Sequence, residues 1–101
     1  MRVRKVDSKI RELLSEWDSF DEVKINSDNI NKMKNIQNRM GALKGLTEDK
    51  RQLADIDKFY KEMSEFNKNI DKFVAQYPGY VNERVYFNFH YGSKFNSNLS
   101  P

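Results

Sequence analysis

The chain contains no cysteine and only one histidine. The absence of cysteine excludes a disulfide framework, catalysis by a thiolate and zinc sites built on cysteine. No run approaches 18 apolar residues, so we expect neither a transmembrane helix nor a membrane partner. The basic N-terminus is not followed by the apolar segment of a secretory signal. These absences predict a cytoplasmic protein.

Patterns typical of catalysis and of cofactor binding are also scarce. His90 lies in an aromatic segment without a cysteine or serine motif around it. The sequence contains no glycine-rich phosphate loop, no EF-hand and no His-Glu-x-x-His motif. Its carboxylates alternate with lysines at helical spacing, which favours a solvated helix face over an acid–base pair. We predict that the chain is not an enzyme and binds no cofactor or metal ion.

Residues 47–77 carry the strongest pattern in the sequence. Apolar side chains recur there at steps of three and four residues, which is the period of one long amphipathic helix. They are Leu53, Ile56, Tyr60, Met63, Phe66, Ile70, Phe73 and Tyr77. No proline or glycine interrupts the stretch, Thr47 is placed to cap its start, and Pro78 with Gly79 ends it.

Two shorter helices are predicted before this long one. The first is expected from about Ser8 to Phe20, where one side is apolar. The second follows a cap at Asn26 or Ser27. It is expected to end in the segment 41–45, where a glycine can adopt the left-handed conformation of a helix stop.

Residues 80–91 have a different character. Apolar and polar side chains alternate there, and aromatic residues are frequent, which predicts a C-terminal strand. A lone strand would leave its backbone groups unpaired. The sequence offers two short partners, residues 22–26 and 1–6. A second copy of the chain or a target protein could also supply the partner strand.

The predicted fold class is mainly α, with three helices, a long third helix and a short C-terminal β-strand or extended segment. We expect one helical domain over residues 1–92 and a flexible tail over 93–101. The aromatic stripe of the third helix exceeds what two shorter helices can cover. A homodimer is therefore also predicted.

Aromatic residues are numerous for a core of this size. Phe59 and Tyr60 are adjacent, so both cannot point inward from one helix. Because aromatic side chains are the usual anchors of interfaces, we predict a partner-binding surface. Its residues would be Phe59, Tyr60, Tyr80, Tyr86 and Tyr91. The alternative is that three helices and a strand use their aromatic residues internally.

The leading functional hypothesis is a small non-enzymatic regulator or inhibitor that occludes a protein target. The small size, the lack of catalytic chemistry and the richness in asparagine, lysine and phenylalanine are typical of accessory proteins of phages and mobile elements.

The charge distribution supports an alternative hypothesis. The formal net charge is only +3, but residues 29–47 include basic residues and no acidic one. Together with a flexible basic N-terminal arm, the second helix could bind the phosphates of DNA or RNA. The residues predicted for this function are Arg2, Arg4, Lys5, Lys32, Lys34, Arg39 and Lys44. A simpler interpretation is that these side chains only keep a small protein soluble.

Overall fold

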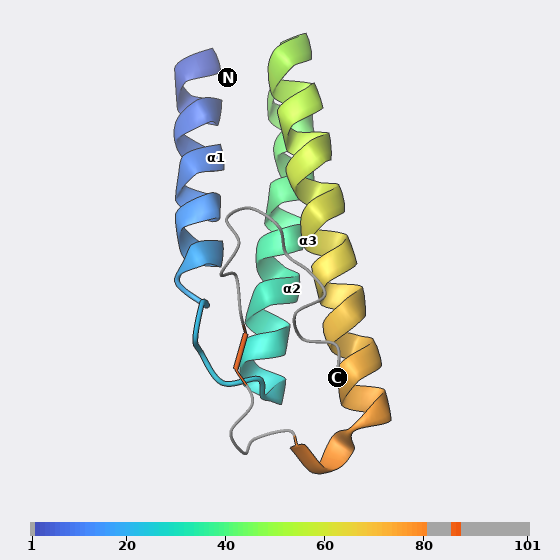
Figure 1. Ribbon diagram of the computed structural model, residues 1–101. Helices are drawn as coiled ribbons and strands as arrows, with labels where there is room; N and C mark the ends of the chain where they lie inside the picture. Colours follow the sequence, from blue (N-terminus) through green and yellow to red (C-terminus); the bar gives the residue numbers. More distant parts are fainter. Residues whose placement is uncertain (1, 81–85, 88–101) are drawn as a thin grey trace.

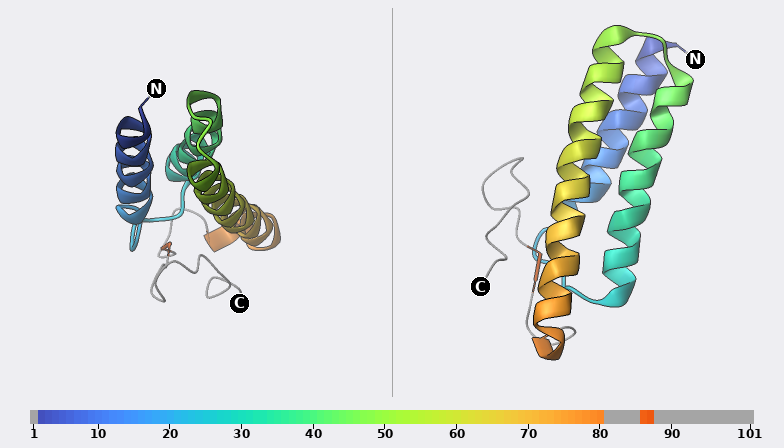
Figure 2. Two further views of the ribbon diagram at one scale, coloured as in Figure 1. Left: turned by 90° about the horizontal axis from the view of Figure 1, so that it is seen from above. Right: turned by 90° about the vertical axis from the view of Figure 1, so that its right-hand side faces the viewer.

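The computed structural model describes residues 2–80, 86 and 87. Its helices are α1 (Val3–Asp18), α2 (Ser27–Ala42) and α3 (Lys50–Gln76), with the 3-10 turns η1 (Leu43–Leu46) and η2 (Pro78–Tyr80). The helices lie side by side, and α2 runs against α1 and α3 (Figures 1 and 2). The predicted helical fold with a long third helix is confirmed. None of the helices described is long and apolar enough to cross a membrane.

One apolar stripe from each helix forms the core. The buried hydrophobic members are Val6, Ile10, Leu13 and Trp17 of α1, Met33, Ile36 and Met40 of α2, and Ile56, Met63, Phe66 and Ile70 of α3. The rings of Trp17 and Phe66 meet edge to face with centroids 5.5 Å apart, which is a favourable aromatic geometry. Much of the stripe predicted for the third helix is thus covered within one chain.

The first helix begins at Val3, more than a turn before its predicted start. Val6 is fully buried, so the extra turn adds an apolar contact to the core. The Val3 carbonyl oxygen also accepts a hydrogen bond of 2.7 Å from Gln52 Nε2. Arg4 and Lys5 therefore lie on α1, and the prediction that they belong to a flexible arm is wrong.

The second helix is capped as predicted by Asn26, whose side-chain oxygen accepts a hydrogen bond of 2.8 Å from the Asn29 backbone amide. Its predicted end is wrong. The helix passes through Gly41 and continues into η1, and neither Gly41 nor Gly45 has a left-handed backbone. The ring of Tyr60 lies over Gly41, where an added Cβ would be 2.9 Å from Tyr60 Cε1 and the ring would have to shift.

A polar network joins the start of α1 to the start of α3. Besides Val3, the buried amide of Gln52 donates to Asp7 Oδ1 over 2.9 Å and accepts from Thr47 Oγ1 over 2.6 Å. Thr47 does not cap α3 as predicted; the cap is Asp49, which accepts from the Gln52 backbone amide over 2.9 Å. The oxygen and the nitrogen of the Gln52 side-chain amide both have hydrogen-bond partners, which offsets the cost of burying this polar group.

Hydrogen bonds from Gln52 and then from Arg51 hold the pKa of Asp7 below its usual range. Arg51 Nη2 lies 3.0 Å from each carboxylate oxygen of Asp7. The opposite shift occurs at Asp18, where burial and the neighbouring Asp21 raise the pKa of the carboxyl.

We predict that the bundle becomes less stable in acid because the stabilising interactions of the Asp7 carboxylate are lost there. A carboxyl with a depressed folded pKa contributes stability above its unfolded pKa of about 4, and this contribution is lost as the pH falls through the folded pKa. Thermal unfolding at a series of pH values from about 7 to about 2.5 should show a shallower loss in Asp7→Asn than in the wild type. Asp18→Asn should steepen the loss, because its carboxyl carries a shift of opposite sign. An unchanged slope in Asp7→Asn would contradict this account.

Phe87, in the C-terminal segment, completes the core. Its side chain is 1% exposed, and its ring centroid lies 5.8 Å from that of Phe66 and 6.4 Å from that of Phe20. Its ring thereby covers apolar surface of α3 and of the turn that follows α1. Phe87 is therefore internal, as the alternative reading of the aromatic residues predicted.

Backbone pairing holds this segment to the α1–α2 connection. The Glu22 amide donates to the Phe87 carbonyl oxygen, and the Phe87 amide donates to the Val23 carbonyl oxygen, both over 2.9 Å. Lys24 and Tyr86 form an isolated antiparallel bridge beside these bonds. Contact with residues 22–26, one of the predicted pairings, is thus present. The longer strand over 80–91 and the tail over 93–101 stay predictions, since most of these residues lie outside the described ones.

Candidate functional site

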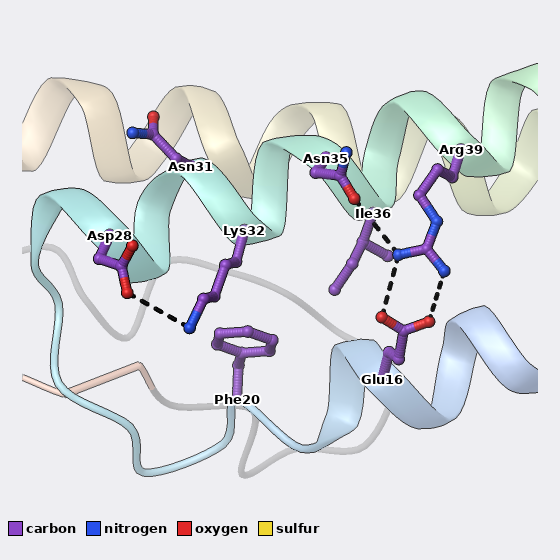
Figure 3. Close-up of a pocket in the computed structure, with 8 residues that line it drawn as sticks. All are labelled: Glu16, Phe20, Asp28, Asn31, Lys32, Asn35, Ile36 and Arg39. Carbon is purple, nitrogen blue, oxygen red and sulfur yellow. Dashed lines mark hydrogen bonds and ion pairs between the residues drawn. The ribbon is translucent and has the colours of Figure 1, made fainter.

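A cleft of about 280 Å³ lies between the end of α1 and α2, where it extends from the first to the last turn of α2 (Figure 3). Its apolar part is formed by the buried Ile36 and the half-buried ring of Phe20, and the exposed amides of Asn31 and Asn35 line it on α2. The complete set of lining residues is Glu16, Phe20, Asp28, Asn31, Lys32, Asn35, Ile36 and Arg39. An apolar surface with polar groups around it suits a side chain and the backbone of another polypeptide.

Two ion pairs flank the cleft (Figure 3). Arg39 donates from Nη1 and Nη2 to the two carboxylate oxygens of Glu16 over 3.0 and 2.6 Å. This bidentate contact lowers the pKa of Glu16 and raises that of Arg39. At the other side, Lys32 Nζ lies 3.2 Å from Asp28 Oδ2. These side chains are about half exposed or more, so each pair contributes about 1 kcal/mol or less and can exchange with charges of a partner.

The basic residues predicted on the second helix are all engaged in ion pairs. The pairs are Lys32 with Asp28, Lys34 with Asp71, Arg39 with Glu16, and Lys44 with Asp57. The stretch that lacks acidic residues in the sequence is thus balanced in space by acidic residues from all three helices. Lys34 and Lys44 reach α3 while Arg39 reaches α1, so the structure does not gather these cations on one face.

The three predicted basic residues at the N-terminus are placed differently. Arg2 is the residue before α1, and Arg4 and Lys5 belong to its first turn. All three side chains are exposed. They form a small basic group at the end of the bundle where α1 begins.

The predicted aromatic residues do not form one surface. Phe59 is half-buried and packs against the core, with Lys58 Nζ 6.0 Å from its ring centroid. Tyr60 is 36% exposed and lies over Gly41 near the end of α2. Tyr86 is 43% exposed and is bridged to a residue just before the start of α2. A helix of 16 residues is about 24 Å long, so the two exposed tyrosines lie toward opposite ends of α2.

Two members of the predicted set are not placed. The side chain of Tyr80 and all of Tyr91 lie outside the described residues. Their assignment to a partner-binding surface stays a prediction.

Sequence reasoning missed the cleft between α1 and α2. A signal for it exists, because Asp28, Lys32, Asn35 and Arg39 are spaced by four, three and four residues and so share one face of a helix. That spacing does not reveal that Glu16 and Phe20 lie opposite, since this depends on how α1 packs against α2.

Comparisons with known proteins give no direct guide to function. No family model, no curated protein and no solved structure matches the chain. Among the described residues, no group of three or more histidine, cysteine or acidic side chains is placed to hold a metal ion. Function is therefore argued from the surface of the bundle itself.

Proposed function

We propose that the chain is a small non-enzymatic regulator or inhibitor that binds a protein target and acts by occluding it. The supporting observation is a difference between the basic and the aromatic side chains of the bundle. The basic side chains of α2 and η1 each have an acidic partner within the chain, whereas Tyr60 and Tyr86 are large apolar side chains that are exposed. Exposed tyrosines are common anchors of protein interfaces.

The α1–α2 cleft extends this proposal. Its apolar part is sized for a side chain of the target, and Asn31 and Asn35 can exchange hydrogen bonds with a polypeptide backbone. The proposal includes a cytoplasmic location and an accessory protein of the phage or mobile-element type.

We predict that Tyr60→Ser and Tyr86→Ser, tested separately, each weaken capture of the target by about tenfold or more, because an interface anchor contributes about 2 kcal/mol or more. Capture from nuclease-treated extract of the native cell, followed by quantitative mass spectrometry, measures this effect. Lys68→Ser, an exposed change on α3, is the matched control. Asn31→Tyr, which fills the cleft from an exposed position, separates the contribution of the cleft from that of the tyrosines.

Thermal unfolding of each variant shows whether a loss of capture comes from loss of binding or from loss of folding. Tyr86 is 43% exposed, whereas Tyr60 is 36% exposed and its ring lies over Gly41, so Tyr60→Ser should lower the melting temperature more than Tyr86→Ser, and capture is compared only at temperatures where each variant is folded. Full capture by Tyr60→Ser, Tyr86→Ser and Asn31→Tyr, all folded, would contradict the proposal.

Binding to DNA or RNA remains the alternative proposal. It is favoured by the exposed Arg2, Arg4 and Lys5, and disfavoured by the ion pairing of the α2 cations. Phosphate contacts make binding fall steeply with salt. Retention on nucleic acid at low salt that is lost in the triple variant Arg2→Glu, Arg4→Glu, Lys5→Glu would support this alternative. Absence of retention at low salt would eliminate it.

A further inference from the structure

The positive charge of the chain is concentrated at the start of α1. Residues 2–12 contain five basic and two acidic residues, so their formal charge of +3 equals that of the whole chain. The basic residues are Arg2, Arg4, Lys5, Lys9 and Arg11, and all five side chains are exposed. Because the rest of the sequence is balanced in charge, the positive field of the molecule is centred on this part of α1.

The bundle does not use these cations for its own stability. In the part of the chain that the structure describes, none of the five forms an ion pair, whereas the basic residues of α2 and η1 each have an acidic partner. The acidic Asp7, which lies among them, is bound by Arg51 and Gln52 of α3. The start of α1 therefore presents positive charge to an anionic partner.

Two exposed aliphatic side chains lie at the same end of the bundle. Val3 is 45% exposed and Leu46 is 37% exposed, and both line a surface depression of about 410 Å³. The depression lies where α1 begins and η1 leads into α3 (Figures 1 and 2). Glu48 and Lys50 beside it are exposed charges of opposite sign, so they leave the positive balance of this end unchanged.

The combination of basic and aliphatic side chains indicates the class of partner. The phosphates of a nucleic acid would engage the cations and leave Val3 and Leu46 without a contact. A lipid surface engages both, because cations bind anionic headgroups and apolar side chains enter the boundary of the acyl chains. The sequence predicted no membrane partner because it lacks a long apolar run, but contact with a lipid surface does not require one.

We propose that the start of α1, together with Leu46, is a contact surface for membranes that contain anionic phospholipids. The basic side chains lie against the headgroups, and Val3 and Leu46 lie at the acyl boundary. Neither Tyr60 nor Tyr86 belongs to this surface, so membrane contact is a second activity beside the proposed binding of a protein target.

Cosedimentation with vesicles tests this surface. The chain should bind vesicles of phosphatidylserine and phosphatidylcholine and should not bind vesicles of phosphatidylcholine alone. Each basic residue near an anionic surface contributes a factor of about five to partitioning, so Arg4→Gln with Lys5→Gln should reduce it about 25-fold. Lys61→Gln with Lys68→Gln removes the same charge from exposed positions of α3 and should reduce it much less.

Leu46→Ser separates lipid contact from simple attraction between charges. This change leaves the net charge unaltered and should reduce partitioning by about threefold, because the aliphatic side chain no longer leaves water. Circular dichroism establishes that each variant is folded. Equal losses in the two double variants, wild-type partitioning of Leu46→Ser, or binding to duplex DNA without binding to the anionic vesicles would overturn the proposal. The capture experiment stays independent, since it measures the variants of Tyr60 and Tyr86.

Discussion

Replacing Phe87 with alanine is expected to lower the free energy of unfolding by about 3–5 kcal/mol. The side chain is buried to 1% exposure, and its ring contacts those of Phe20 and Phe66. The substitution removes the transfer free energy of the ring and leaves a cavity beside Phe20 and Phe66 that rigid helices cannot close. A loss of this size is a large fraction of the stability of a small domain. Urea unfolding followed by the fluorescence of Trp17 measures it.

The neighbouring residue supplies the control. Tyr86 is bridged to Lys24 but is 43% exposed, so Tyr86→Ala should cost about 0.5 kcal/mol or less. A cost for Phe87→Ala no greater than that for Tyr86→Ala would show that the C-terminal segment does not contribute to the core. The double variant with Phe66→Ala should cost less than the sum of the single changes, because the two rings contact each other.

The second large effect is expected for Gln52→Glu, which preserves the shape of the side chain and removes its two N–H donors. In the wild type these donors bind the Val3 carbonyl oxygen and Asp7 Oδ1. The introduced carboxylate would face two acceptors inside the bundle, one of them charged. Leaving a buried charge without a partner costs about 3–5 kcal/mol. Urea unfolding at neutral pH should show a loss of this order.

The pH dependence identifies the cause. The introduced carboxyl group has a raised folded pKa, so protonation in acid should restore part of the stability. Adding Asp7→Asn should also recover part of it, because an amide can donate where the carboxylate could only accept. Gln76→Glu, at the exposed end of α3, is the isosteric control and should cost about 0.5 kcal/mol or less. A loss in Gln52→Glu that is unaffected by pH and by Asp7→Asn would contradict this assignment.

Periodicity predicted the helices because each carries a continuous apolar stripe. The steps from Ile56 through Met63 and Phe66 to Ile70 in α3 fall on one face, and all four side chains are buried. The ends of helices were predicted less well. Val3 starts α1 early because Gln52, distant in the sequence, binds its carbonyl oxygen. No local pattern carries that information.

Only part of the candidate site could be predicted from the sequence. Because Phe59 and Tyr60 are adjacent, the sequence showed that both could not point inward. It placed Tyr60 on the apolar stripe, whereas the structure exposes Tyr60 and packs Phe59 against the core. The ion pairing of the basic residues in α2 and η1 could not be predicted from the sequence, because Lys34 and Lys44 pair with acidic residues of α3 and Arg39 pairs with one of α1. Pairing across helices depends on how the helices pack. The sequence predicted a strand around Phe87, and only the fold shows which side chains Phe87 contacts.

A titration of the purified chain against its captured target, performed by calorimetry at low and at moderate salt, tests the central proposal most directly. Binding through tyrosines and a cleft with an apolar part predicts a dissociation constant that changes little between the two salt concentrations and rises about tenfold or more in Tyr60→Ser and Tyr86→Ser. An affinity that falls steeply with salt and is unaffected by both tyrosine substitutions would contradict it.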